Sequence, residues 1–188
     1  MEKQNYNQKE IILSVAKQIA LEQGMSRINI RLVAKKSNIS IGTVYNNYTT
    51  KADLIVAVIE DFWIEAYKKI DLTNLIDKNF YEKIEEVYNT LSTYLQNFKD
   101  NWLDQIVQLS SQEKQLGRKK QEEYFGKIRN MIVTFIDNDT SISDNIWVDG
   151  ISKEKTAKFI SDNMLIMLKN NEEDLSFFIS LLKKIITD

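Results

Sequence analysis

Turn-forming residues are almost absent from this sequence, and their shortage limits the fold more than any other feature. The 188 residues include no proline and only five glycines. Folds rich in β-strands depend on these residues for the tight turns that join the strands, whereas helices need far fewer of them. We therefore expect an all-α protein. The hydrophobic content of 43% is sufficient for a packed core.

Apolar residues recur at helical spacing along most of the chain. In residues 8–23, Ile12, Ala16 and Ile19 follow the i, i+4, i+7 pattern of an amphipathic helix. Similar patterns predict about nine helices in total. The others are expected near residues 29–37, 41–48, 51–70, 80–98, 102–109, 113–137, 153–170 and 171–186. Residues 138–151 are rich in Asn, Asp and Ser and are predicted to form a loop.

The segment 29–51 has the layout of a helix-turn-helix, in which one helix can enter a DNA major groove. Asn29 and Ser40 are favourable N-cap residues, because their side-chain oxygens can accept a hydrogen bond from the first turn of the following helix. Asn38 stands at the turn, where it tolerates a positive φ better than any residue except glycine. Thr50 opens a Thr-x-x-Asp sequence, which predicts the start of the next helix.

Charge is distributed unevenly along the chain, although the net charge is only -2. Residues 1–51 hold eight Lys or Arg and three Asp or Glu, which gives a net charge of +5. The remaining residues hold 17 Lys or Arg and 24 Asp or Glu, which gives a net charge of -7. A basic head on an acidic body is typical of a DNA-binding domain joined to a part that does not touch DNA. Chance asymmetry among solvated charges is the alternative explanation.

Several classes of functional site are excluded by residues that the chain lacks. It contains no histidine and no cysteine, which rules out disulfides, thiolate metal sites and His-dependent nucleophiles. Neighbouring carboxylates such as Glu85 and Glu86 point in different directions on a helix. We therefore expect no enzyme activity, no metal and no cofactor. The chain also lacks an apolar membrane span and a signal peptide, which predicts a cytoplasmic protein.

A spaced pattern of residues runs through the first part of the chain. It consists of Ile12, Leu13, Val15, Ala16, Gly24, Val33 and Ala34, followed by Ser40-x-Gly42-Thr43-Val44-Tyr45-x-x-Tyr48-x-x-Lys51-x-x-Leu54. With this pattern, residues 8–56 resemble the N-terminal DNA-binding domain of the TetR family of bacterial transcription regulators. The sequence departs from the family pattern at Ala20, Asn29, Asn38, Asn46 and Asn47. These substitutes suit the same backbone positions, so the departures concern the operator sequence rather than the fold.

The resemblance implies a set of DNA-contacting residues. Asn47 could bind an adenine edge, Tyr45 and Lys51 would contact phosphates, and Gly42 would let the helix approach DNA closely. The full set is Arg31, Ser40, Ile41, Gly42, Thr43, Tyr45, Asn46, Asn47 and Lys51. For Lys35 and Lys36, the sequence leaves a DNA contact and an ordinary solvated charge equally open.

The resemblance further implies that the remainder of the chain binds a small effector and forms a homodimer through its last two helices. We accordingly divide the chain into a DNA-binding domain at residues 1–50 and an effector-binding and dimerisation domain at 51–188. Candidate pocket residues are Phe62, Trp63, Tyr67, Tyr88, Phe98, Trp102, Tyr124 and Phe125. Candidate dimer contacts are Ile160, Met164, Met167, Phe178, Ile179, Leu182 and Ile186. Both sets could instead form plain core.

The function that the sequence predicts is that of a DNA-binding transcriptional regulator. We expect a homodimeric repressor that a small-molecule effector releases from a palindromic operator. An effector-independent structural or cell-division regulator on the same fold is the alternative.

Overall fold

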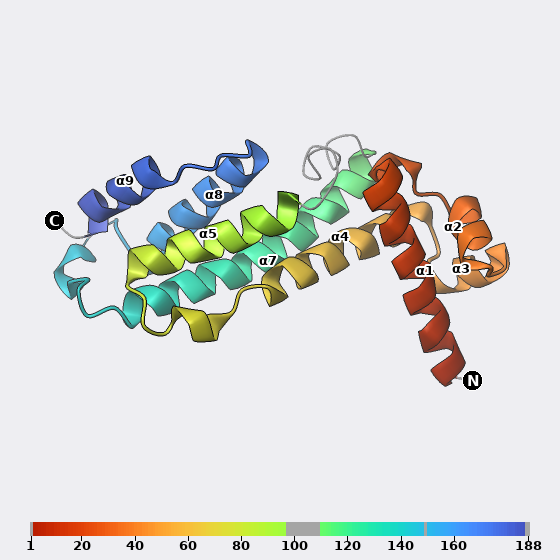
Figure 1. Cartoon of the computed structure of the whole chain (residues 1–188), viewed down its shortest axis with the longest axis horizontal. Coiled ribbons are helices and arrows are strands. Elements are labelled where there is room, and N and C mark those ends of the chain that lie inside the picture. The colour runs from red at the N-terminus through yellow and green to blue at the C-terminus, as the bar shows by residue number, and fades with distance from the viewer. Residues whose placement is uncertain (1, 97–109, 149, 187–188) are drawn as a thin grey trace. The chain divides into compact units, whose positions relative to one another are not determined.

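The computed structural model describes residues 2–96, 110–148 and 150–186, and within these ranges all regular structure is helical (Figure 1). The α-helices are α1 (Glu2–Gln23), α2 (Ile30–Ser37), α3 (Ile41–Asn47), α4 (Lys51–Lys68), α5 (Phe80–Gln96), α7 (Ser111–Asp137), α8 (Lys153–Lys169) and α9 (Ser176–Ile186). Short 3-10 helices are η1 (Met25–Arg27), η2 (Leu72–Leu75) and η3 (Asp144–Ile146). The all-α prediction is confirmed. The helix expected at 102–109 lies outside the described residues.

The chain divides into two compact units. The first unit holds α1, α2, α3, α4 up to Glu65 and α7 up to Glu122. The second unit holds the rest of α4 and α7 together with α5, α8 and α9. The domain boundary expected between residues 50 and 51 stays a prediction. None of the described helices is both long and apolar enough to cross a membrane.

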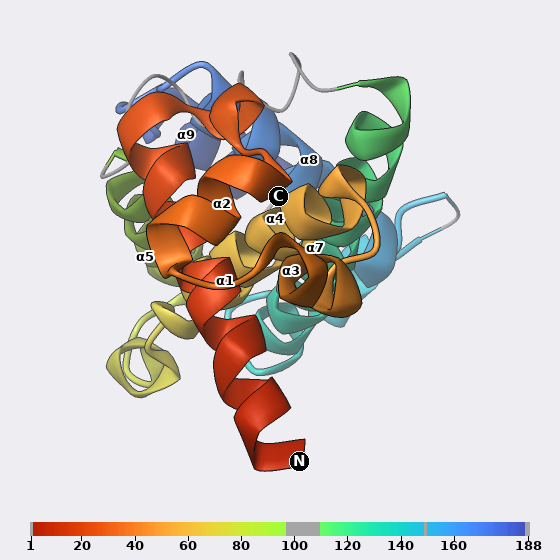
Figure 2. The ribbon, with the colours of Figure 1, turned by 90° about the vertical axis from the view of Figure 1, so that its right-hand side faces the viewer.

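The core of the first unit forms where α1 packs against α2 and α3 (Figure 2). Ile12, Ala16 and Ile19 of α1 are completely buried, as the helical spacing of these residues requires. Val33 of α2 and Val44 of α3 complete this core. Burial of each large apolar side chain stabilises the unit by roughly 1.5–3 kcal/mol. This core fixes the positions of α2 and α3.

The second unit is built around α5, which packs against both α8 and α9. The N-terminus of α5 is capped from a distant part of the chain, because the backbone N–H of Phe80 donates to Asp139 Oδ2 at 2.6 Å. The same carboxylate accepts hydrogen bonds from the backbone and the hydroxyl of Ser141. Further along α5, the hydroxyl of Tyr88 donates to the carbonyl oxygen of Glu172. These hydrogen bonds tie the turns after α7 and α8 to α5.

Two helix boundaries differ from the sequence-based expectation. The first helix begins at Glu2 and not near residue 8, because a polar segment without proline or glycine can continue a helix that the core already holds. The last helix begins at Ser176, so the expected start at residue 171 is wrong. Asn171 adopts a left-handed conformation, with φ of 51°, where α8 ends. At the start of the last helix, the backbone N–H of Ser176 donates a hydrogen bond to Asp174 Oδ1 at 2.8 Å.

Candidate nucleic-acid interface

The turn between α2 and α3 has the geometry of a helix-turn-helix. Asn29 caps α2, since its Oδ1 accepts a hydrogen bond from the backbone N–H of Leu32 at 2.8 Å. Asn38 ends the helix in a left-handed conformation with φ of 54°. The chain then turns back, and the N–H of Ile39 donates to the carbonyl oxygen of Ala34 at 3.1 Å. The predicted roles of Asn29 and Asn38 are therefore confirmed.

Hydrogen bonds among its own side chains fix the start of α3. Ser40 Oγ accepts from the backbone N–H of Thr43 at 3.1 Å, which confirms the predicted N-cap. The two hydroxyl groups of Ser40 and Thr43 are also 2.8 Å apart. Asn47 Nδ2 donates to the carbonyl oxygen of Thr43 at 2.9 Å. A primary amide has two N–H donors and one oxygen, so this bond leaves one N–H and the oxygen of Asn47 for an adenine edge.

The outer face of α3 exposes two large side chains to solvent. Ile41 is 45% exposed and Tyr45 is 50% exposed, whereas Val44 and Tyr48 are buried on the opposite face. Arg31, Ser40, Gly42, Asn46 and Lys51 are also exposed, and Thr43 and Asn47 are half-buried. A Cβ added at Gly42 would meet only Ser40 Oγ, at 3.8 Å, so packing inside the protein does not require glycine there. Seven of the nine residues predicted from the sequence are therefore exposed to solvent.

A reciprocal capping box joins α3 to α4. The backbone N–H of Thr50 donates to Asp53 Oδ2 at 2.9 Å, and the N–H of Asp53 donates to Thr50 Oγ1 at 3.1 Å. Lys51 is the first residue of α4 and is exposed. The predicted box is confirmed, and it fixes the backbone of Lys51 at the start of α4.

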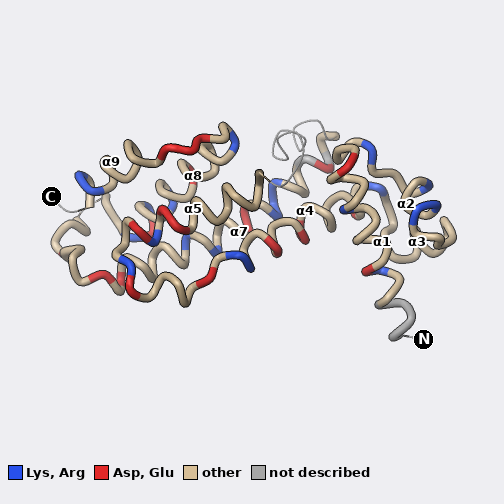
Figure 3. The backbone as a smooth tube through the Cα atoms, viewed as in Figure 1, with Lys and Arg blue, Asp and Glu red and all other residues tan. Residues whose placement is uncertain are grey.

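The segment of sequence that contains α2 and α3 carries basic residues and no acidic ones. No Asp or Glu occurs between Glu22 and Asp53. The same interval carries five cations, Arg27, Arg31, Lys35, Lys36 and Lys51. Figure 3 shows that basic residues are the charged residues on α2, with acidic residues lying elsewhere on the chain. Such a surface attracts polyanions through the field of its summed charges.

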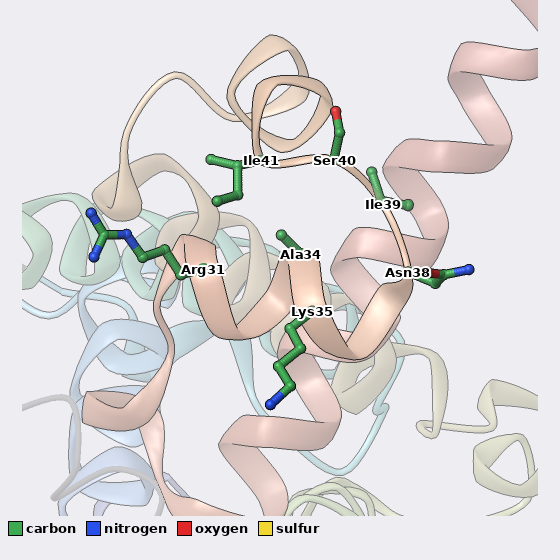
Figure 4. Close-up of a pocket in the computed structure, with 7 residues that line it drawn as sticks. All are labelled: Arg31, Ala34, Lys35, Asn38, Ile39, Ser40 and Ile41. Carbon is green, nitrogen blue, oxygen red and sulfur yellow. The ribbon is translucent and has the colours of Figure 1, made fainter.

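A hollow of about 510 Å³ lies between α2 and α3 (Figure 4). Arg31, Ala34 and Lys35 of α2 form one side, and Ser40 and Ile41 form the other. Asn38 and Ile39 of the turn close its end. The sequence did not predict this hollow, because it depends on the angle between two short helices.

Polar contacts that sequence reasoning missed hold α4 within the first unit. Asp61 of α4 pairs with Lys17 of α1, and the neighbouring Glu60 pairs with Lys120 of α7 at 2.7 Å. Burial raises the pKa of Tyr48 to about 12, and the negative charge of Asp61 adds to this shift. These pairs join residues that are far apart in the sequence, so helical periodicity gives no signal for them.

The candidate effector residues are distributed over both units. Phe62 and Trp63 are buried in the first unit, where their rings form an edge-to-face contact with centroids 5.1 Å apart. In the second unit Tyr88, Tyr124 and Phe125 are buried, whereas Tyr67 is half-buried. Phe98 and Trp102 lie outside the described residues. Neither the hollow between α2 and α3 nor a second hollow beside α8 and α9 is lined by these described aromatic side chains.

The candidate dimer residues belong mostly to the core of the second unit. Ile160, Met164, Phe178, Ile179, Leu182 and Ile186 are buried within the single chain, and Met167 is half-buried. Other apolar residues of α8 and α9 are exposed, namely Phe159, Ile166, Phe177, Leu181 and Ile185. Phe177 is 78% exposed. The dimer contacts predicted from the sequence stay a prediction, and the same two helices also carry the exposed apolar residues named above.

The second hollow, of about 220 Å³, belongs to this exposed face of α8 and α9. Ile151, Phe159 and Ile185 are among the residues that line it. The remaining lining residues are Gly150, Lys155, Thr156 and Leu182. The face is thus both apolar and recessed.

Comparison with known proteins places this geometry in context. Residues 12–58 match the model for bacterial regulatory proteins of the tetR family. No curated protein matches the chain in sequence. Solved structures match its fold, including the reduced form of NemR from E. coli, with a TM-score of 0.67, 15% identity, and coverage of 97% of this chain and 100% of that one.

Two further solved structures show the same arrangement of helices. The fatty acid degradation regulator FadR from Bacillus halodurans has a TM-score of 0.63 and 14% identity, with 95% of this chain and 94% of that chain covered. BioQ, solved with its double-stranded DNA operator, has a TM-score of 0.63 and 16% identity, with coverage of 94% and 95%. At these identities, the likeness establishes the fold.

Proposed function

We propose that this protein, which has a tetR-family match at residues 12–58 and the fold of TetR-family regulators, represses transcription as a homodimer on a palindromic DNA operator. The observation that carries the proposal is the exposed face of α3, with Ile41 and Tyr45 open to solvent beside an acid-free cationic segment. Exposed apolar side chains on a capped helix are suited to contact base edges and sugars in a groove. BioQ, a structural relative, was solved on its DNA operator.

The exposed surface suggests a role for each proposed DNA contact. Arg31, Tyr45 and Lys51 carry donors suited to phosphates, which fix the register of a protein on the duplex. Asn46 and Asn47 carry amides that can bind adenine, and Thr43 can contact a thymine methyl. Ser40, Ile41 and Gly42 form the end of α3 that would approach the bases most closely. In this proposal, residues 1–50 form the DNA-binding domain and residues 51–188 the remainder.

Two observations support dimerisation: α3 is short, and α8 and α9 expose an apolar face. A helix of seven residues offers few base contacts, whereas two copies about one helical turn of DNA apart can read a palindrome. Phe159, Phe177 and Ile185 supply an apolar surface that a second copy would cover. We propose this face as part of a dimer contact made by α8 and α9, the two helices that also carry the contacts predicted from the sequence.

A small-molecule effector would act through α4. This helix starts at the capping box beside α3 and contributes residues to both units. A ligand with different affinities for two positions of α4 would shift their populations and change operator affinity. Phe62, Trp63, Tyr67, Tyr88, Tyr124 and Phe125 remain the proposed ligand contacts among the described residues. The proposal includes no catalytic activity and places the protein in the cytoplasm.

The experiment that tests this function is selection of bound duplexes from a random DNA pool by the full chain, with and without candidate effectors. Enrichment of an inverted repeat supports a dimeric operator-binding protein, and loss of the enriched duplexes with one effector supports ligand release. Enrichment that no effector changes favours the second candidate, an effector-independent structural or cell-division regulator. If no duplex is enriched, the DNA-binding function is contradicted.

A further inference from the structure

Two neighbouring lysines on α2 have different surroundings. Lys36 Nζ lies 3.2 Å from Glu22 Oε2, so its charge is engaged by a carboxylate of α1. Lys35 is exposed, and no carboxylate pairs with it in the part of the chain that the structure describes. Sequence reasoning could not distinguish the two lysines, whereas the structure shows that only Lys36 has a carboxylate partner among the described residues.

Lys35 also lies at the hollow between α2 and α3, whereas Lys36 does not line it. Arg31 stands one turn earlier on the same face of α2. In Figure 4 the side chains of Arg31 and Lys35 extend outward from the helix, while Ala34 and Ile41 lie between α2 and α3. None of the seven lining residues is acidic.

The two cations and the apolar side chains at this hollow are chemically complementary to the sugar-phosphate backbone of one DNA strand. A deoxyribose can rest against the apolar carbons of Ala34 and Ile41, and the adjacent phosphates can meet the two cations. Ile41 is 45% exposed, so contact with a sugar would remove apolar surface from water. Among the described residues Lys35 has no carboxylate partner, so its charge is available to a phosphate.

We propose that the hollow between α2 and α3 receives the sugar-phosphate backbone of one DNA strand, with Lys35 as a phosphate-binding residue and Lys36 excluded from the contact. This inference rests on the proposed DNA-binding function and deepens it. Arg31, one helical turn before Lys35, contacts a phosphate of the same strand. The groove adds a sequence-independent contact beside the base-reading face of α3.

The test compares Lys35→Gln with Lys36→Gln in the full chain, since both changes remove one exposed positive charge from the same helix. Binding to a fluorescent random-sequence duplex of about 30 base pairs is measured by anisotropy between about 50 and 200 mM salt. For each bound protomer, Lys35→Gln is expected to reduce the slope of log K against log salt by about 0.9 and to weaken binding roughly fivefold to tenfold near 0.1 M salt. Lys36→Gln should leave the slope unchanged, and Lys35→Arg should keep both the slope and the affinity.

The outcomes separate this inference from the function on which it rests. If the wild-type protein binds duplexes and the two glutamine variants behave alike, the groove assignment is overturned while DNA binding stands. Failure of Lys35→Arg to preserve binding also overturns it, because a phosphate accepts either cation. If the wild-type protein binds no duplex at all, the proposed function and this inference both fail.

Discussion

Thr50 and Asp53 each accept a hydrogen bond from the other's backbone N–H group, at 3.1 and 2.9 Å respectively. The pair therefore satisfies two donors that would otherwise be unpaired at the start of α4. The carboxylate of Asp53 also lies at the positive end of the helix dipole, where a negative charge is favourable. Lys51 stands between the two residues, so its backbone position depends on them.

Replacing Asp53 by alanine should lower the free energy of unfolding by about 1 kcal/mol, because the N–H of Thr50 loses its acceptor. Urea denaturation followed by circular dichroism measures this loss. Asp53→Asn is the matched control, since an amide oxygen can still accept the bond, and it should retain most of the stability. Equal stability of Asp53→Ala and the wild type would show that the box does not hold the start of α4.

Tyr45 and Asn47 should affect DNA binding in different ways. Tyr45→Ala removes an exposed phenol proposed to contact a phosphate, so affinity should fall by a similar factor for all duplexes. Asn47→Ala removes an amide proposed to read a base, so preference among duplexes should relax by about 1–3 kcal/mol at one position of each half-site. Gel shifts on selected and random duplexes measure both effects. Unchanged shifts for both variants would contradict the assignment of α3.

The short-range features of this fold were predictable from the sequence. Asn29, Asn38, Ser40 and Thr50 all act on backbone groups within a few residues, so residue type and spacing were enough to assign their roles. Turn chemistry and helical periodicity are local properties.

The long-range features were not predictable in the same way. Phe80 is capped by Asp139, which is 59 residues away, and no local pattern links the two. Periodicity identified apolar residues on α8 and α9, but it could not tell which of their faces packs on α5. The periodic pattern therefore contains Ile160 and Leu182, which are buried in the single chain, and gives no signal for Phe159 and Phe177, which are exposed.

Phe177→Asp should separate a dimer without unfolding the chain. Phe177 is 78% exposed on α9, so a carboxylate there remains solvated in the monomer but would be buried against a second copy. Sedimentation velocity measures the expected shift from dimer to monomer. Ile76→Asp is the matched control, because Ile76 is an exposed apolar residue at the end of η2 and belongs to neither α8 nor α9. Loss of the dimer in both variants, or in neither, would contradict the assigned face.

Tyr48 and Tyr88 offer a matched pair for testing buried hydroxyl groups. Burial raises the pKa of each phenol to about 12, with nearby carboxylates adding to the shift. Tyr88 donates its hydroxyl proton to the carbonyl oxygen of Glu172. The hydroxyl of Tyr48 has no hydrogen-bond partner among the described residues. At pH 7, Tyr88→Phe should therefore cost about 1 kcal/mol of stability, while Tyr48→Phe should be neutral or stabilising.

The stability of the wild-type protein should fall as the pH rises from about 10 to about 12. In this window the unfolded chain releases phenol protons that the folded chain retains at Tyr48, because its pKa is raised by burial. Below pH 10 the phenol is neutral in both states and contributes no pH dependence. Urea denaturation at several pH values should give a shallower decline for Tyr48→Phe than for the wild type. Parallel declines in the two proteins would mean that Tyr48 ionises as readily in the folded state as in the unfolded chain.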